Sequence, residues 1–500
     1  MGAGGRTRCV RRTLVAGMVT CTAVAAAAVA MAVGGTQAHA ASATAPIAVD
    51  CSRTLADQFG YAPDYTQHVP AFDNLNRPYI RSRTVSQDRT SFVHTLADSI
   101  WVRRGLLDAL RAAYPGFAGT LGAGGYMSDR IVFDTQDRAY TLLTIRLESG
   151  HFRNVLLYSL DLCASWRACT LPFGDSRPRR DGHDLGNMTC ESFVGHNSID
   201  GPPFVAVWHE VGDWPGDWAS RNELYVLQPQ FEGDRLVVPA PTLVTRRFVG
   251  MVLSAGGASF AVTSGQSTYF VYAEVTAPAN RSAPIFVARF DHATGTVGPR
   301  KLVCRAFPAN DVHDTPGICV DSRGYLHVVG GAHHHPFRYT HSLKAFDISA
   351  WSRPRKVLTA GYRDSTTDAD GEGRQTYLSF VCDQNDTLHI VSRQRRCGVD
   401  RRYPGVAYDA LVHQSRPSNG DWSHARVLVY RGDSPGYVNY YQKLALDRLG
   451  NLYLSLNLYR PTGPSATRPL RRFRHRMVLF SSDGVSWRFA TTGDFGNSLP

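Results

Sequence analysis

Long apolar runs are missing from this sequence beyond its first forty residues, where no run reaches the ~18 residues of a membrane-spanning helix. Long helical patterns are scarce as well, whereas glycine (45 residues) and aromatic residues (11%) are frequent, which favours β-structure. No stretch rich in proline, glycine and serine divides the chain into separate domains. Charged residues reach only 19% against 43% hydrophobic ones, so the chain can bury a core and is not of the disordered class.

The first forty residues have the features of a secretory signal. Four arginines between residues 6 and 12 form a basic start, residues 14–33 are small and apolar, and Ala38-His39-Ala40 is a small-x-small cleavage site. We therefore expect residues 1–40 to be removed and the product to be exported and soluble. Loss of these four arginines lowers the formal net charge from +12 to +8, a balance suited to polyanions such as acidic polysaccharide or nucleic acid.

Cysteine is present, but without the CxxC spacing that is typical of zinc sites. Eight of the ten cysteines follow the expected cleavage site, and an even number in an oxidising compartment predicts disulfide bonds. Three pairs are close enough in sequence to be local, namely Cys163–Cys169, Cys304–Cys319 and Cys382–Cys397, and Cys51 and Cys190 remain. The pairing itself does not follow from the sequence.

One pattern recurs about every sixty residues: an apolar strand, a turn usually marked by aspartate, and a second strand with period-two alternation. Because four antiparallel strands repeated seven times make a β-propeller, we predict an all-β, single-domain, seven-bladed propeller over residues 67–500. Residues 41–66 form an N-terminal lead, and Leu106 to Tyr114 is the clearest helical patch. The markers of the seven copies are Asp73, Asp134, Asp200, Ser264, Asp321, Asp383 and Asp447.

In a propeller, the residues that lead into each innermost strand surround one mouth of the central channel. The position eight residues before the marker should lie there, and it carries phenol, imidazole and amide groups. Tyr377 and Tyr440 follow shortly after two of these positions. The five copies place Tyr65, Tyr126, His313, Gln375 and Asn439 at this position.

The stretch from Asp311 to His341 concentrates imidazoles around two short strands. Its apolar runs, residues 318–320 and 325–329, are separated by a turn that contains Asp and Gly, as a hairpin requires. Since antiparallel strands bring the start of one beside the end of the next, His313 and His333 should meet at one edge. Loops that leave the second strands also bring Arg393 to this mouth.

These motifs resemble a family of BNR-repeat propellers that includes ulvan lyases and lyases acting on rhamnosyl-glucuronic acid. The resemblance runs from Tyr269 to Trp487, a little under half of the chain, and rests on HDTPGICVD, GYLHVVGGAHHHPFRY, GEGRQTY, LHIVSR and NYYQ. In the relatives the histidine-bearing blade comes near the N-terminus, whereas here it is the fifth repeat. The chain is therefore circularly shifted or extended at its front, and the first three repeats carry no motif of the family.

The resemblance implies that His313 and His333 are the paired active-site histidines, Tyr377 a catalytic-site tyrosine and Arg393 a carboxylate-binding arginine. β-Elimination at a 4-linked uronic acid needs a neutralised carboxylate, a base for the C5 proton and an acid for the departing O4. Whether His313 or Tyr377 takes the proton stays open at this stage. The expected substrate-binding residues are Tyr440, Arg374, Asn439, His334 and Tyr126.

We therefore expect an exported monomeric lyase of acidic polysaccharide, with no nucleic acid partner and no cofactor in catalysis, while a structural divalent cation stays open. Two alternatives remain: a propeller glycosidase, with carboxylates drawn from Asp311, Asp314 and Glu372, and a glycan-binding propeller without activity. His183, His196 and His209 lie near acidic residues, but their spacing fits no zinc pattern, which favours scattered loop residues. No metal ligands are therefore predicted.

Overall fold

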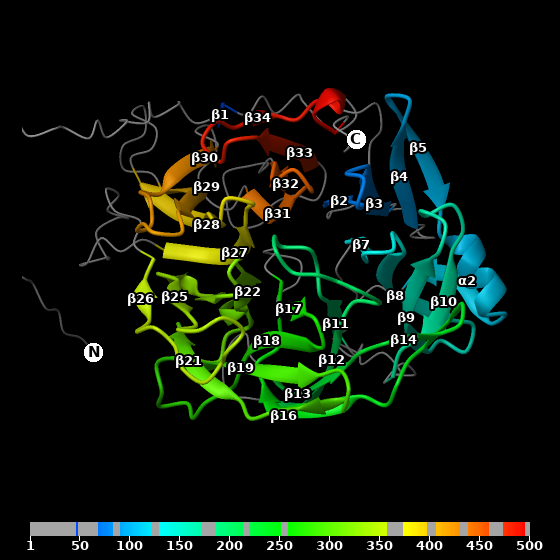
Figure 1. The fold of residues 1–500 in the computed structure, drawn as a ribbon, viewed down its shortest axis with the longest axis horizontal. Coiled ribbons are helices and arrows are strands. Elements are labelled where there is room, and N and C mark those ends of the chain that lie inside the picture. The colour runs from blue at the N-terminus through cyan, green and yellow to red at the C-terminus, as the bar shows by residue number, and fades with distance from the viewer. Residues whose placement is uncertain are drawn as a thin grey trace, which may run out of the picture. The chain divides into compact units, whose positions relative to one another are not determined.

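Seven β-sheets are arranged around a central axis, so the chain forms a seven-bladed β-propeller in the residues that the structure describes (Figure 1). In this computed structural model those are residues 47–48, 69–83, 91–121, 130–172, 187–213, 220–251, 259–357, 374–397, 407–430, 439–459 and 474–495. The predicted fold class is thus confirmed. The predicted signal, residues 1–40, lies outside the described residues.

The first four blades follow one another along the chain, each built from consecutive antiparallel strands. Blade 1 holds β2 (Pro70–Phe72), β3 (Pro78–Arg83), β4 (Ser91–Ala97) and β5 (Ile100–Gly105). Blade 2 holds β7 (Val132–Phe133), β8 (Ala139–Leu147), β9 (Phe152–Ser159) and β10 (Arg167–Thr170), with β6 (Phe117–Leu121) added on β8. Blade 3 holds β11 (Asn187–Cys190), β12 (Val205–Asp213), β13 (Ser220–Leu227) and β16 (Thr242–Phe248), and a side hairpin of β14 (Gln230–Glu232) and β15 (Arg235–Val237). Blade 4 holds β17 (Ala261–Ser264), β18 (Ser267–Ala273), β19 (Ala283–Asp291), β20 (Thr296–Val297) and β21 (Lys301–Ala306).

The last three blades complete the ring. Blade 5 holds β22 (Gly317–Val320), β23 (Leu326–Gly330), β25 (Arg338–His341) and β26 (Arg355–Lys356). Blade 6 holds β27 (Arg374–Cys382), β28 (Leu388–Cys397), β29 (Ala407–Arg416) and β30 (Arg426–Tyr430). Two further strands extend its sheet: β24 (His333–His335) pairs with β27, and β1 (Ile47–Ala48), from the predicted N-terminal lead, pairs with β30. Blade 7 holds β31 (Asn439–Leu446), β32 (Leu452–Tyr459), β33 (Arg474–Ser481) and β34 (Arg488–Phe489).

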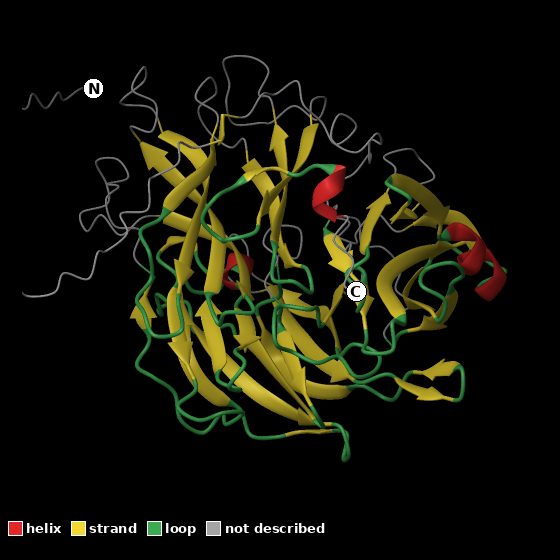
Figure 2. Cartoon of the chain, turned by 45° about the horizontal axis from the view of Figure 1, so that its top comes forward, coloured by secondary structure: helices red, strands yellow, loops and turns green. Residues whose placement is uncertain are grey.

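Helices are few among the described residues (Figure 2). The helical patch predicted at Leu106 to Tyr114 forms α2 (Leu107–Ala113), which connects blades 1 and 2 and buries Leu107 and Leu110 in an apolar cluster of these two blades. Two 3-10 turns, η1 (Val312–Asp314) and η2 (Thr492–Phe495), complete the set. The first of them precedes β22 and carries a candidate site residue.

The recurring aspartate has a local reason, which blade 2 shows clearly. One carboxylate oxygen of Asp134 accepts backbone N–H groups two and four residues later, from Gln136 and Arg138, both at 2.9 Å. The other oxygen accepts the hydroxyl of Tyr140 at 2.7 Å. This side chain therefore closes the turn between the first two strands of a blade, as short polar side chains do in Asx turns. The same backbone contacts recur at Asp73, Asp321, Asp383 and Asp447.

Two of the seven predicted markers do not form this turn. In blade 3 the first two strands are separated by a long connection, and exposed Asp200 accepts only a local hydroxyl bond, from Ser198 at 2.5 Å. In blade 4 the short turn after Ser264 joins β17 to β18 directly. The strand pairs of blades 3 and 4 were thus predicted, but their turns lack the aspartate contacts found in the other five blades.

The core lies between neighbouring sheets. Val, Ile and Leu side chains of blades 4 to 7 form one continuous buried cluster, and smaller clusters join blades 1 and 2, 2 and 3, and 3 and 4. Each fully buried aliphatic or aromatic side chain contributes about 1.5–3 kcal/mol relative to exposure. A single blade could not bury both of its faces, so the ring as a whole is the stable unit.

Blades 1 and 7 meet without sharing a strand, because their sheets are separate among the described residues. Their contact is made by side chains. Phe72 of blade 1 lies with its ring centroid 4.9 Å from that of Tyr453, and Asn76 donates to the turn carboxylate of Asp447 at 3.3 Å. The amide N–H of Arg448 returns a bond to Asn76 at 2.7 Å. We call this contact the closing interface.

Candidate active site

The four residues predicted to be catalytic gather at one end of the innermost strands of blades 5 and 6. His313 lies in η1, just before β22, and His333 is the first residue of β24. Tyr377 lies in β27, and Arg393 lies in β28 opposite Thr376. Because β24 leaves blade 5 and pairs with β27 of blade 6, His333 is placed opposite Thr376, the neighbour of Tyr377.

Asp311 holds the two histidines in place. Its carboxylate caps η1 by accepting the backbone N–H of His313 at 2.8 Å. The same oxygen lies 2.5 Å from Nδ1 of His313, and the second oxygen lies 2.8 Å from Nδ1 of His333. The imidazole rings stack with their centroids 4.1 Å apart. Since Nδ1 of each ring donates to the carboxylate, Nε2 is the ring nitrogen on the opposite side, where a proton can be taken or given.

The charges of this group are coupled. Burial alone would raise the pKa of Asp311, but the hydrogen bonds from His313 and His333 lower it well below its usual value, so the carboxylate is ionised. Burial lowers the pKa of His313, and the Asp311 carboxylate offsets part of this shift. A neutral His313 with its lone pair on Nε2 is therefore the favoured form near neutral pH, as a general base requires.

Tyr377 is presented by an irregularity in β27. The register of the β27–β28 pair shifts between Thr376 and Ser379, and Tyr377 has φ 64°, the left-handed region that bulky residues rarely adopt. Its carbonyl accepts a bond from Gln442 of blade 7 at 2.6 Å. The ring centroid lies 5.2 Å from that of His313. Such strained positions cluster at functional sites, because they turn a side chain away from the regular strand direction.

Arg393 lies beneath Tyr377 rather than open to the channel mouth. Its guanidinium carbon is 4.2 Å from the centroid of the Tyr377 ring, and the residue is only 1% exposed. The terminal nitrogens are buried, so a direct contact with a substrate carboxylate requires the tyrosine ring to move. In this arrangement the Arg393 guanidinium stacks on the ring of Tyr377, so its charge acts on the phenol group.

The expected substrate-binding residues do not all lie near the paired histidines in the described part of the chain. His334 joins the cluster, with its ring centroid 4.4 Å from that of His333 and its N–H donated to Thr376 at 3.1 Å. Arg374 is half-buried at the start of β27. Tyr126 lies outside the described residues, and Tyr440 and Asn439 lie on β31 with side chains outside the described part.

Gln375, predicted to line the mouth, is instead fully buried. Its side-chain oxygen accepts the N–H of Phe337 at 2.7 Å, and its amide nitrogen donates to Gln414 at 3.0 Å. It therefore ties blades 5 and 6 together, because Phe337 belongs to blade 5 and Gln414 to blade 6. Tyr65, predicted at the same mouth, lies outside the described residues.

A cavity of about 560 Å³ is lined by His335, the last residue of β24, but not by His313 or His333. Asn310 and His335, which flank Asp311 and His334 in sequence, belong to its lining, together with Arg338 and Phe307. The guanidinium of Arg338 lies 5.0 Å from the centre of the Phe307 ring. Arg281 and Lys356 also line this cavity, so it is suited to an anionic group.

Two carboxylates near the cluster were considered in the sequence only for hydrolysis. Asp311 has the positioning role described above, and the spacing Asp-x-His was the signal that could have revealed it. Asp314 is fully buried with neither oxygen hydrogen-bonded among the described residues. Burial, together with the neighbouring Asp311 charge, raises the pKa of Asp314 well above its usual value. The third carboxylate, Glu372, lies outside the described residues.

The six cysteines whose side chains are described are free thiols, so the structure does not support the expected disulfide bonds at these positions. Cys163 is buried in a turn after β9. Cys169 lies on β10, where its thiol faces the carbonyl of Leu156. Cys304 lies on β21, whereas Cys319 lies on β22 and contacts Cys382 of the next blade. Neighbours in sequence are thus not neighbours in the sheets. The free thiols include Cys163, Cys169, Cys190, Cys304, Cys319 and Cys382.

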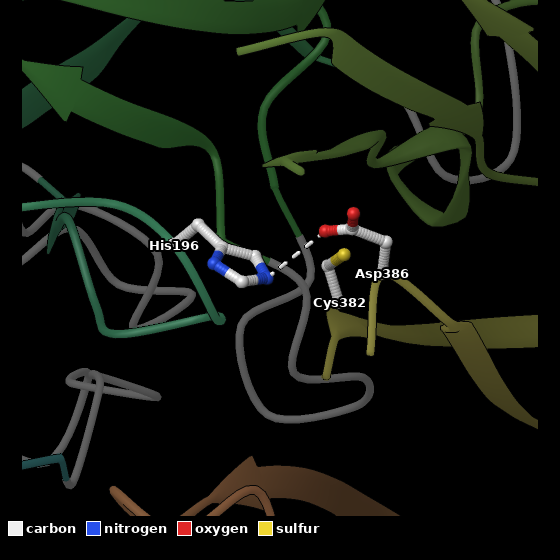
Figure 3. Close-up of side chains that lie close together, drawn as sticks. All are labelled: His196, Cys382 and Asp386. Atoms are coloured by element: carbon white, nitrogen blue, oxygen red, sulfur yellow. Dashed lines mark ion pairs between the residues drawn. The ribbon is translucent and has the colours of Figure 1, made fainter. Parts of the chain in front are cut away.

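A second group of chemically active side chains lies at the opposite end of β27 (Figure 3). His196, from the connection between β11 and β12, points toward Cys382 at the end of β27 and toward Asp386 in the following turn. A hydrogen bond from Cys319 and the nearby His196 lower the pKa of the Cys382 thiol. The sequence linked His196 to His183 and His209 instead. His209 pairs with Glu223 at 3.6 Å, and His183 lies outside the described residues.

No helix in the described part of the chain combines the length and apolar character needed to cross a membrane.

Comparison with solved structures finds propellers of carbohydrate-active enzymes at low similarity. Trypanosoma rangeli sialidase in complex with the inhibitor DANA is 11% identical, with TM-score 0.41, covering 81% of this chain and 60% of that one. Hadza microbial sialidase Hz136 is 10% identical, with TM-score 0.34 and coverages of 65% and 62%. Xylan β-1,4-xylosidase from Bacillus halodurans C-125 is 12% identical, with TM-score 0.28 and coverages of 59% and 53%. The chain thus spans less than two thirds of each, and at these values the neighbours carry no argument about its reaction.

Similarity in sequence is confined to one region. No curated protein matches the chain. The matched family is described as "BNR repeat-containing family member", and the match runs over residues 273–466. This region contains His313, His333, Tyr377 and Arg393, so the part of the chain that forms the candidate active site is similar to BNR-repeat proteins.

Proposed function

We propose that this protein is an exported polysaccharide lyase that cleaves a 4-linked uronic acid residue of an acidic glycan by β-elimination. The observation that carries the proposal is the Asp311 carboxylate bridging two stacked imidazoles beside a tyrosine that is backed by a buried arginine. This set supplies a base, an acid and positive charge, which are the three demands of the reaction. It requires no cofactor.

In the proposed reaction, Nε2 of neutral His313 takes the C5 proton of the uronate. The C4–O4 bond breaks, its electron pair leaves with O4, and the hydroxyl of Tyr377 donates its proton to that oxygen. A double bond remains between C4 and C5, and solvent returns a proton to Tyr377 and takes the proton from His313. His333 contacts the carboxylate of the substrate, so that negative charge can develop at C5.

Arg393 has a supporting role in this scheme. Because its guanidinium lies under the Tyr377 ring, it stabilises the phenolate that remains after the proton has been given to O4. The cationic cavity beside His335 and Arg338 accepts neighbouring acidic sugars of the polymer. Its Arg and Lys side chains, and the net positive charge of the chain, support an anionic substrate.

Hydrolysis by a pair of carboxylates is less well supported by the described residues. A glycosidase needs one carboxylic acid and one carboxylate facing the same bond. Here both oxygens of Asp311 are hydrogen-bonded to imidazoles, and Asp314 is buried away from the mouth.

The test is a panel of ulvan, rhamnosyl-glucuronate gum, glycosaminoglycans and pectin, with product formation followed by the ultraviolet absorbance of an unsaturated uronate. A rise in absorbance with at least one polymer is expected. New reducing ends without that absorbance would mean a hydrolase, and retention of polymer without products would mean a binding propeller; either result contradicts the proposal. The His151→Gln variant, which alters a histidine in a turn of blade 2, serves as a matched control.

A further inference from the structure

Residues 191–199, here called the crossing segment, span the channel at the end opposite the candidate active site. The segment belongs to blade 3 but contacts several other blades. Ile199 accepts the N–H of Thr135 in blade 2 at 2.9 Å, and the N–H of Ser198 donates to Thr263 in blade 4 at 3.2 Å. On the far side, the Phe193 ring lies 4.0 Å from the guanidinium of Arg448 in blade 7.

The closest approach of the crossing segment is to blade 6. The carbonyl of Val194 accepts the N–H of Cys382 at 2.9 Å. At Gly195, which has φ +137°, a Cβ atom would lie only 2.0 Å from the carbonyl oxygen of Cys382. A glycine is therefore required here, and it lets the two backbones approach closely enough to bring His196 against the end of β27.

Three donor atoms converge at this contact (Figure 3). Nε2 of His196 lies 3.2 Å from Oδ1 of Asp386 and 2.9 Å from the carbonyl oxygen of Asp383. The donor atoms of His196, Cys382 and Asp386 all lie within 4.8 Å of one another. In a tetrahedral site with metal–ligand bonds of 2.0–2.3 Å, neighbouring donors are roughly 3.3–3.8 Å apart. With a contraction of the three groups, and with release of the Nε2 proton that His196 donates to the Asp383 carbonyl, an ion would fit among the three.

We propose that His196, Cys382 and Asp386 bind a zinc ion that fastens the crossing segment to blade 6. Imidazole nitrogen, thiolate sulfur and carboxylate oxygen together are the donor set that zinc accepts and that calcium and magnesium do not. Cys382 is buried, while the side chains of His196 and Asp386 are 22% and 16% exposed, which leaves one side of the site open for a fourth ligand from solvent. The thiol of Cys319 supports the Cys382 sulfur from blade 5.

The proposed ion is structural, not part of the elimination reaction. Cys382 and Tyr377 are five residues apart on β27, which corresponds to about 16 Å at ~3.3 Å per residue. The zinc site therefore lies near the other mouth of the channel. It would hold together blades 3 and 6, which are not neighbours in the ring.

The experiment measures zinc directly. The full-length protein is purified, incubated with zinc chloride, desalted, and analysed by elemental mass spectrometry. We expect about one zinc per chain in the wild type and a loss of most of it in Cys382→Ser and His196→Ala. The matched controls Cys169→Ser and His151→Gln should keep the wild-type content. Cobalt(II) in place of zinc should give a thiolate-to-metal absorption band that disappears in Cys382→Ser.

A wild-type protein without bound zinc would overturn the proposal, and so would zinc that is retained fully by both ligand variants. If Cys382→Ser does not fold, Asp386→Asn is used, which should weaken zinc binding at least tenfold. The carboxylate of Asp386 also accepts two hydrogen bonds from Ser322 of blade 5, each at 2.7 Å, so the folding of this variant is measured as well. Unchanged affinity in that variant would also contradict the proposal. Because metal content is the readout, the result is independent of whether the protein is a lyase.

Discussion

The two ends of the innermost strands differ in how strictly they repeat. At the turn end, five blades use the same aspartate contacts to close the first hairpin. At the opposite end, the blades diverge, and blades 5 and 6 place Asp311, His313, His333 and Tyr377 together there. The comparison indicates that turn chemistry maintains the ring, while the residues that precede the strands are free to carry function.

The largest expected effect is on the reaction rate, from a substitution at the end of the strands where the blades differ. His313→Ala removes the proposed base and should lower kcat by about 10²–10⁴-fold, the usual contribution of general base catalysis. Some loss of thermal stability is expected as well, because this side chain is mostly buried and hydrogen-bonded to Asp311. Lyase rate and thermal unfolding are measured on the same preparation, with His151→Gln as control. Full activity in His313→Ala would remove this residue from catalysis.

Asp311→Asn should cost about tenfold to a hundredfold in kcat, since the two imidazoles lose the acceptor that fixes their orientation. The dependence of kcat on pH tests this positioning role more directly. The Asp311 carboxylate raises the pKa of His313 against the effect of burial, so its removal should lower that pKa and move the acidic limb of the kcat profile to lower pH. A merely structural role would lower the rate without moving this limb.

The repeating end is tested through stability. Asp134→Ala removes acceptors for two backbone N–H groups and for Tyr140 in a buried turn, and should cost about 2–4 kcal/mol in the free energy of unfolding. Asp200→Ala changes the exposed marker that forms no such turn, and should stay within about 0.5 kcal/mol of the wild type. Denaturant unfolding measures both. Equal effects would show that the aspartate turn does not stabilise the ring.

The smallest expected effect on the kinetics comes from Arg338, which lines the cavity next to His335. Arg338→Ala should raise KM for the polymer by about threefold to tenfold, as loss of one charge-assisted contact does, and leave kcat nearly unchanged. Steady-state kinetics on polymer and on a short oligosaccharide separate the two parameters. The variant should bind the short substrate almost normally; a large fall in kcat would place Arg338 in the reaction instead.

Local patterns explain why so much of the ring could be predicted. The aspartate turn is formed within five residues, and the alternation of each strand is visible in the sequence, so blade positions followed from them. The meeting of His313 with His333 was predicted because antiparallel strands have a fixed geometry. The union of these histidines with Tyr377 followed from the family resemblance and is explained here by β24, which crosses from blade 5 to pair with blade 6.

Contacts between distant residues could not be predicted. His196 and Asp386 belong to blades 3 and 6, far apart in sequence, and the crossing segment brings them together. The burial of Gln375 and of the Arg393 guanidinium depends on neighbouring blades, which the pattern of one strand does not report. The free thiols have the same cause, since proximity in sequence did not translate into proximity between sheets.

The closing interface has a consequence for how such a protein can evolve. Because blades 1 and 7 are joined by side chains and not by a common strand, whole blades can be moved from one terminus of the gene to the other without cutting a blade. Only β1, the N-terminal strand that extends the sheet of blade 6, would have to move separately. Joining the old ends and opening the chain between any other two blades would preserve every hairpin. The circular shift that the family resemblance predicts for the histidine-bearing blade, fifth in this chain, would be a rearrangement of this kind.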